Sequence, residues 1–396
     1  MSVTHPKGFV AAGVTAGLKS SGKPDVSLVV NEGPEFTAAG VFTSNRVVAA
    51  PVVWSKQAVA DGRLDAVILN SGGANAATGA PGFQDTHATA EHVAKALQAS
   101  GRDVSSGDVG VCSTGLIGLR LPMDKLLAGV DVATAGLTSD GGPAAAVAIM
   151  TTDSVPKTVG IDIGVDNAAG WSIGGMAKGA GMLAPGMATM LCVITTDAKV
   201  SAPTAQAALA SAVATTLNRL DSDGCMSTND TVLLLASGAS GIEPTGSEFA
   251  EALTQACHEI AQQLLTDAEG ATHDIAITVT NATTEGAAEA VARAVARSNL
   301  FKAAIFGKDP NWGRIIAAVG TVPEDVAPFD ALALDVWVNG VHVCKASGVG
   351  EPRELVDLEP RAVDILIDLH AGHANATVWT NDLTHDYVHE NSAYST

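Results

Sequence analysis

A glycine-rich stretch that runs straight into a strand-forming segment constrains this chain more than any other feature. Residues 178 to 188 read KGAGMLAPGMA and lack both helix caps and the alternating pattern of a strand. The next residues, TMLCVITT from Thr189 onward, are mostly apolar or β-branched and predict a buried strand. A flexible loop therefore leads directly into a rigid element, and the boundary between them is the Ala188–Thr189 bond.

The residue types at this boundary allow a specific chemistry. If the chain were cut just before Thr189, its hydroxyl would lie beside a free α-amine, which can take the hydroxyl proton. Ala188 is small enough for Thr189 Oγ1 to approach its carbonyl carbon, and the loop glycines permit the strained conformation that this attack needs. An N→O acyl shift and ester hydrolysis would give two chains, 1–188 and 189–396. Because threonine at a strand start is ordinary β-propensity, this hypothesis depends on the sequence around it.

Composition restricts the class of protein. With 396 residues and 47% hydrophobic content, the chain can bury the cores of two or three domains. It has 41 glycines and only 4% aromatic residues, which favours a core of Ala, Val, Ile and Leu in layered α/β packing. Its 22 basic residues against 42 acidic ones give a net charge of −20, which argues against nucleic acid and anionic membranes as partners.

Targeting signals are not expected either. The N-terminus has no signal-peptide pattern, and no apolar run approaches the roughly 18 residues that a spanning helix requires. These features predict a cytoplasmic protein that contacts no membrane.

Periodicity predicts the order of elements in the first two thirds of the chain. Strands are expected over 25–31, 39–44, 65–72 and 109–115, followed by a strand pair at 155–165 and 171–179 that leads into the junction. Helices are expected over 86–100, 121–130, 203–220 and 247–268, and the stretch 137–146 reads as a loop. We expect Thr86 or Thr89 to cap the first of these helices and Ser247 to cap the last.

The order of strand and helix patterns in the sequence changes near residue 274. From there, strand patterns alternate with single helical patterns and turns, which predicts a smaller α/β domain over about 274–396. No fixed-period repeat is present.

Cofactor chemistry finds little support in the sequence. The five cysteines form no C-x-x-C pair and lie in apolar or Gly-rich contexts, which predicts small buried thiols rather than a disulfide scaffold. The glycines of residues 68–79 fit neither the Rossmann nor the P-loop spacing. The histidines are scattered without metal-ligand spacing. We therefore predict neither a metal nor a cofactor.

Several further motifs, taken with the junction, carry a family resemblance that spans the chain. They are STG (113–115), MTTD (150–153), STNDT (227–231), DAEG (267–270), DPNWGR (309–314) and ENSAYST (390–396). In this order they resemble the ornithine acetyltransferase family, the bifunctional glutamate N-acetyltransferases of arginine biosynthesis. Two positions depart from the usual family pattern, with Gly186 in place of Asn and His273 in place of Lys.

The resemblance implies a role for particular residues. It makes Thr189 the nucleophile after cleavage of the Ala188–Thr189 bond, and it makes the Thr114 hydroxyl and the Gly115 N–H an oxyanion hole. On its own, STG after a strand is a polar turn. The implied substrate-binding residues are Thr151, Lys178, Thr189, Glu269, Asn391 and Thr396.

Two of these residues also stand out in the sequence itself. A lysine in a loop is usually solvated, but in a chain so poor in Lys and Arg the apolar and Gly-rich surroundings of Lys178 favour a function, which the resemblance gives as binding a substrate carboxylate. Glu269 follows a predicted helix, where a carboxylate opposes the helix dipole. Its implied role is to pair with the amino group of ornithine or to steer the incoming amine.

The resemblance further implies a fold, an activity and an assembly. The fold would be an α/β protein with a four-layer αββα sandwich and a smaller α/β C-terminal domain. The activity would be acetyl transfer from N2-acetyl-L-ornithine to L-glutamate, with acetyl-CoA as a second donor left open. The assembly would be a heterotetramer of two alpha (1–188) and two beta (189–396) chains. The alternatives are an N-terminal-nucleophile aminopeptidase or amidase, in which water replaces glutamate, and an uncleaved binding protein.

Overall fold

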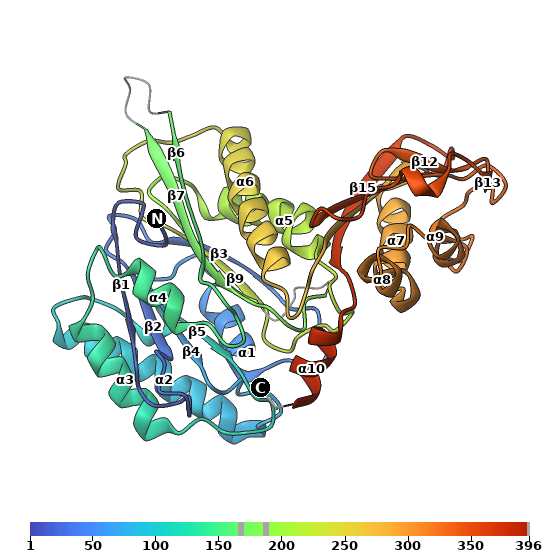
Figure 1. The fold of residues 1–396 in the computed structure, drawn as a ribbon. Coiled ribbons are helices and arrows are strands. Elements are labelled where there is room, and N and C mark those ends of the chain that lie inside the picture. Colours follow the sequence, from blue (N-terminus) through green and yellow to red (C-terminus); the bar gives the residue numbers. More distant parts are fainter. Residues whose placement is uncertain (165–169, 185–189, 394–396) are drawn as a thin grey trace.

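Two sheets stacked face to face, with helices on both outer sides, form the larger part of the molecule (Figure 1). The computed structural model describes residues 1–164, 170–184 and 190–393, so the Ala188–Thr189 junction and Thr396 lie outside the described residues. A third sheet with its own helices forms a smaller C-terminal domain. The predicted fold class, an αββα sandwich with a smaller α/β domain, is confirmed.

The first sheet pairs four strands in the order β1-β2-β4-β5, of which β4 and β5 are parallel. They are β1 (Phe9–Val14), β2 (Val26–Asn31), β4 (Ala66–Ser71) and β5 (Val109–Thr114). Side chains alternate between the faces of a strand, so Ala66 and Ile68 pack under helices α2 (Gly79–Ala99) and α3 (Met123–Ala135). Val67 and Leu69 point the other way, into the core between the two sheets.

The second sheet has the order β3-β9-β8-β7-β6. Its strands are β3 (Thr37–Phe42), β9 (Thr231–Ala236), β8 (Leu191–Thr196), β7 (Trp171–Lys178) and β6 (Lys157–Ile163). In β9, Val232 and Leu234 face helices α5 (Ala202–Thr215) and α6 (Gly246–Thr266), while Leu233 and Leu235 face the first sheet. Each such buried side chain stabilises the fold by about 1.5 to 3 kcal/mol. Because both faces of β8 and β9 are buried, these two strands are mostly apolar or β-branched along their length.

Two short helices contribute residues to the core between the sheets. Helix α1 (Ala50–Ala58) packs on β5, and helix α4 (Gly142–Ala148) packs on β1. Both add alanines to the inter-sheet core. The described chain also has short 3-10 turns at Ser106–Asp108, Leu217–Arg219 and Arg353–Leu355.

The C-terminal domain encloses a core of its own. Its sheet runs β13-β12-β11-β14-β10-β15. The strands are β10 (Asp274–Ala282), β11 (Asp335–Val338), β12 (Val341–Lys345), β13 (Gly348–Val349), β14 (Ala362–Asp368) and β15 (Ala374–Asn381), and the helices are α7 (Glu285–Ala296), α8 (Asn299–Phe306) and α9 (Trp312–Val319). After β15 the chain returns toward the sandwich as helix α10 (His385–Ala393), drawn in red in Figure 1.

The predicted helix caps were wrong. Thr86 and Thr89 lie inside α2, where each hydroxyl donates to the carbonyl four residues earlier. Helix α6 is capped by Thr245 and not by Ser247. The Thr245 side chain accepts the Glu248 N–H while the Glu248 carboxylate accepts the Thr245 N–H, a reciprocal capping box that a serine at 247 cannot form.

Two other predictions failed locally. The stretch 137–146 is not a loop throughout, because α4 starts at Gly142 with a proline in its first turn and buries Ala145 and Ala146 between the sheets. The cysteines are free, and four of them are buried as predicted, but Cys225 is exposed in the polar loop before β9. Among the described helices, none is both long and apolar enough to cross a bilayer.

Candidate active site

The STG motif forms a tight turn at the end of β5. Gly115 has φ +128°, and a Cβ there would lie 2.6 Å from the Gly73 nitrogen, so only glycine fits. The Thr114 carbonyl accepts the N–H groups of Gly72 and Gly73. This close packing holds the turn rigidly against the end of the neighbouring strand.

Thr114 has the property that an oxyanion hole requires. Its side chain is buried, and within the described residues its Oγ1 has no hydrogen-bond partner. Over the same residues no acceptor is found for the Gly115 N–H. A buried hydroxyl left without a partner costs about 1 to 3 kcal/mol, and an oxyanion placed against it would supply the missing acceptor.

Asn229 connects this turn to the second sheet. Its side-chain amide donates to the carbonyls of Ala74 (2.6 Å), which follows β4, and Ser113 (2.8 Å), which lies in β5. The Ser113 hydroxyl in turn donates to Asn70 Oδ1 at 2.6 Å. These buried bonds fix the end of β5 against the residues that precede β9.

Asp230, the next residue, holds the start of β8. Its Oδ1 accepts the Met190 N–H at 3.0 Å, and Met190 is bonded to the predicted nucleophile, Thr189. Within the described chain, its buried Oδ2 has no hydrogen-bond partner. Burial raises the pKa of Asp230 well above its usual range, an effect that the Met190 N–H, Ser227 and Lys178 partly oppose.

The register of β7 against β8 places Lys178 at the start of β8. Lys178 ends β7 and pairs with Leu191 in β8, so it lies beside the first residues after the junction. Only 2% of Lys178 is exposed. Burial lowers the pKa of its ammonium, while Asp153, Glu269 and Asp230 act in the opposite direction.

Asp153 is the centre of the charges around Lys178. Its carboxylate accepts from Lys157 Nζ (2.6 Å), the Gly179 N–H (2.6 Å) and the Thr151 N–H (2.8 Å). Lys178 Nζ is 3.9 Å from its Oδ2. Burial alone would raise the pKa of Asp153, but Lys178, Lys157 and the Gly179 N–H lower it to about 2. The MTTD segment and the loop after β7 therefore meet at one ionised carboxylate.

Glu269 reaches this region from the segment after α6. Its N–H donates to the Ala180 carbonyl at 3.0 Å, and its carboxylate lies against Gly181, where a Cβ would come within 2.5 Å of Oε2. Asn391 of α10 donates to the same oxygen at 2.9 Å. A cavity of about 240 Å³, lined by Thr152, Glu269, Glu390 and neighbouring residues, opens beside this contact.

The predicted site residues that the structure describes therefore gather in one region. Thr114 and Gly115 are joined through Asn229 and Asp230 to the start of β8. Thr151 and Lys178 are linked through Asp153, and Asn391 through Glu269, to residues 179–181. Ala188, Thr189 and Thr396 lie outside the described residues. No cluster of three or more His, Cys, Asp or Glu side chains able to hold a metal is found in the described residues.

Comparison with known proteins establishes the family. The ArgJ family model matches residues 10–396. The chain belongs to the ArgJ family. The resemblance inferred from the sequence motifs is thereby confirmed.

ArgJ relatives match over the whole chain. The "Arginine biosynthesis bifunctional protein ArgJ" of Streptomyces coelicolor is 60% identical, and its namesake in Thermobifida fusca is 58% identical, each over 100% of both chains. Among solved structures, ornithine acetyltransferase of Mycobacterium tuberculosis complexed with ornithine is 60% identical, covering 46% of this chain and 94% of that chain with a TM-score of 0.45. The ArgJ of Bacillus halodurans is 36% identical, covering 50% and 97% with a TM-score of 0.48.

Four residues of this ArgJ-family site had no predicted role. Asn229 and Asp230 lie in the quoted STNDT motif and Asp153 in MTTD, so the motifs held the signal although the partners could not be deduced. The fourth is Lys19, whose ammonium donates to the carbonyls of Pro24 and Met150. Burial lowers the pKa of Lys19 to about 8, while Asp25 and Asp153 oppose that change.

Proposed function

We propose that this ArgJ-family chain is a self-cleaving acetyltransferase that moves an acetyl group from N2-acetyl-L-ornithine to L-glutamate. The observation that carries the proposal is the buried Thr114 hydroxyl, which has no partner within the described residues. It lies in a turn that is joined through Asn229 and Asp230 to the start of β8. The name of the 60% identical relative, an arginine biosynthesis bifunctional protein, supports substrates from arginine biosynthesis.

In the proposed mechanism Thr189 carries the acetyl group. Its Oγ1 attacks the acetamide carbonyl carbon, its α-amine takes the hydroxyl proton, and the carbonyl oxygen becomes an oxyanion bound by the Thr114 hydroxyl and the Gly115 N–H. The amine then gives the proton to the departing ornithine nitrogen, which leaves an acetyl ester on Thr189. The amino group of glutamate attacks this ester and regenerates the hydroxyl.

The surrounding charges suit these substrates. Lys178 is buried with its nearest described carboxylate, Asp153, at 3.9 Å, so a substrate carboxylate would relieve the cost of burying the ammonium. Glu269 supplies the opposite charge for a substrate ammonium, and Asn391 donates a hydrogen bond to the Glu269 carboxylate. Thr151 and Thr396 complete the proposed substrate contacts. Both substrates carry a carboxylate and an amine, which these charges would orient.

Maturation would produce two chains that stay together. We propose cleavage between Ala188 and Thr189, giving 1–188 and a chain of 208 residues (396 − 188). β7 belongs to the first and β8 to the second, and they pair along six residue positions, from Ile173↔Thr196 to Lys178↔Leu191. We further propose a heterotetramer of two such pairs, a cytoplasmic location, and acetyl-CoA as a donor to be tested separately.

Denaturing electrophoresis and N-terminal sequencing test the maturation step. The wild type is expected to give two fragments, the second beginning at Thr189. Thr189→Ala should remain one inactive chain of about 39.8 kDa. Thr283→Ala, at an exposed position in the C-terminal domain, is the matched control and should mature normally. Any other new N-terminus would contradict the assignment.

Two-substrate kinetics test the covalent intermediate. Because the acetyl-threonine must form before glutamate reacts, double-reciprocal plots at several glutamate concentrations should be parallel. Intersecting lines would mean that both substrates bind together and would remove Thr189 as acetyl carrier. Rapid acetylornithine hydrolysis without glutamate would instead indicate an amidase.

A further inference from the structure

Helix α10 carries Asn391 to the candidate site without burying any residue of its own. None of its residues from His385 to Ala393 is buried. Most helical stability in proteins comes from packing an apolar face, so something outside α10 must hold it in place. Its polar contacts to the DAEG segment are the Asn391 bond to Glu269 and a bond from the Thr384 hydroxyl to the Gly270 carbonyl at 2.7 Å.

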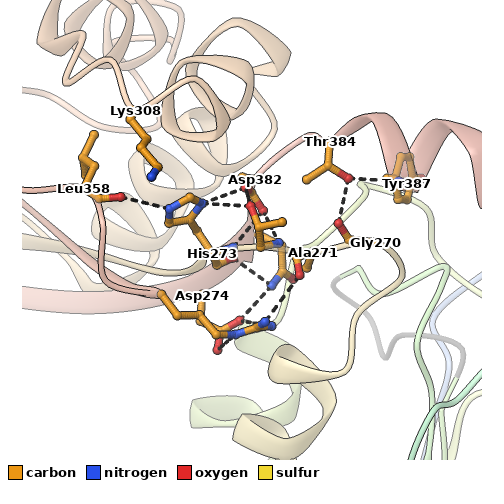
Figure 2. Close-up of polar contacts among 12 residues, drawn as sticks. Gly270, Ala271, His273, Asp274, Lys308, Leu358, Asp382, Thr384 and Tyr387 are labelled. Atoms are coloured by element: carbon orange, nitrogen blue, oxygen red, sulfur yellow. Dashed lines mark hydrogen bonds and ion pairs between the residues drawn. The ribbon is translucent and has the colours of Figure 1, made fainter.

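A buried carboxylate holds the chain just before α10 against Thr272 and His273, the residues that follow the DAEG segment. Figure 2 shows Asp382 facing His273, with Thr384 bridging Gly270 and Tyr387. Asp382 accepts the backbone N–H groups of Thr272 (2.9 Å) and His273 (3.0 Å). It also accepts the Thr272 hydroxyl and binds His273 Nδ1 at 2.8 Å. The side chain of Asp382 is fully buried.

His273 adds a connection to the C-terminal domain. Its Nε2 lies 3.2 Å from the carbonyl of Leu358, on the far side of the ring from Asp382 (Figure 2). Asn381 reinforces the same connection, since its side-chain amide donates to the carbonyls of Leu265 (3.0 Å) and His273 (3.2 Å). The end of β15 and the segment carrying Glu269 are therefore bound together at consecutive residues.

We propose that Asp382, with His273 as its main side-chain partner, is a positioning residue of the substrate site that fixes α10, and with it Asn391, against Glu269. The proposal rests on the proposed function for its kinetic consequences but not for its structural ones. Asp382 itself is not placed at the reacting atoms. It acts by keeping two substrate-binding side chains, which come from segments far apart in the sequence, at a fixed separation.

The test compares Asp382→Asn with a matched control. Asp221→Asn also neutralises a fully buried aspartate between the sandwich and the C-terminal domain, but Asp221 pairs with Arg293 and Arg297 and makes no bond to Thr272 or His273. Hydrogen exchange would be followed at the amides of residues 385–391 in the complete protein. We expect Asp382→Asn to accelerate exchange there by about tenfold or more, since local opening becomes easier, and Asp221→Asn to leave it unchanged.

Kinetics then separate positioning from general destabilisation. Asp382→Asn should raise the KM for N2-acetyl-L-ornithine about tenfold while kcat changes less than about threefold, because Thr114 and the junction are untouched. Asp221→Asn should leave KM unchanged. If Asp382→Asn fails to fold, Thr272→Val removes one donor to Asp382 and should shift exchange and KM in the same direction by less.

Two results would overturn the proposal. One is wild-type exchange and KM in Asp382→Asn, and the other is an equal rise of KM in Asp382→Asn and Asp221→Asn. If the wild type transfers no acetyl group, the proposed function fails, whereas the exchange comparison still decides whether Asp382 holds α10.

Discussion

Replacing Asp153 by asparagine should destabilise the protein strongly, because its carboxylate is shared by two buried lysines. The pKa of Asp153 falls from 3.8 to about 2 in the folded protein, and at about 1.4 kcal/mol per pKa unit this shift corresponds to about 2 to 3 kcal/mol of stabilisation. The substitution also leaves Lys178 without its nearest described carboxylate and Lys157 with Asp267 alone. Removing one partner of a buried ion pair costs about 3 to 5 kcal/mol. We expect a loss in this range at pH 7.

The lowered pKa of Asp153 determines how the stability difference between wild type and Asp153→Asn changes with pH. Because folding lowers the pKa of Asp153, its ionised form stabilises the folded state above the unfolded pKa of 3.8, and the contribution is lost as the pH falls toward about 2. Urea denaturation of wild type and Asp153→Asn should therefore differ most at neutral pH and converge below pH about 4. The exposed Asp140→Asn serves as control. A loss under about 1 kcal/mol at pH 7, or a difference that does not shrink in acid, would refute the reasoning.

Two further predictions concern catalysis and binding. Thr114→Ala should lower kcat about 10²- to 10³-fold and leave the KM for N2-acetyl-L-ornithine nearly unchanged, because the Thr114 hydroxyl acts mainly on the oxyanion. A mutant that transfers acetyl at the wild-type rate would show that STG is only a polar turn. Asn391→Ala should raise the KM for N2-acetyl-L-ornithine severalfold, as steady-state kinetics would measure. Because Asn391 is exposed, the free energy of unfolding, measured by denaturation, should change by less than about 0.5 kcal/mol. An unchanged KM would remove Asn391 from the site.

The strands of the sandwich were predictable because each is an apolar run bounded by turn residues. The expected strands at 25–31, 65–72 and 109–115 correspond to β2, β4 and β5 within one residue at each end. Helix starts were less predictable. Several residues near the start of α6 can cap, and the choice of Thr245 depends on the reciprocal bond to Glu248, which spacing alone did not single out.

The candidate site was predictable in its residues more than in its connections. The motifs supplied Thr114, Lys178 and Glu269, but nothing local indicates that Asn229 binds the Ser113 carbonyl, 116 residues away. Such bonds depend on how two sheets stack. Helix α10 was missed for a related reason, since it buries none of its residues and so shows no apolar periodicity.

The charges around Lys178 suggest why the proposed site binds amino acids rather than simple amides. A buried ammonium is costly unless a carboxylate lies in direct contact, and Asp153 is 3.9 Å away and already accepts from Lys157 and Gly179. In the described chain, Lys178 therefore has unused capacity for one more anionic partner. The carboxylate of either substrate can fill it, whereas acetamide alone cannot. Binding energy gained at Lys178 would then be available to place the acetyl carbonyl against Thr114, so that a donor lacking the carboxylate loses turnover as well as affinity.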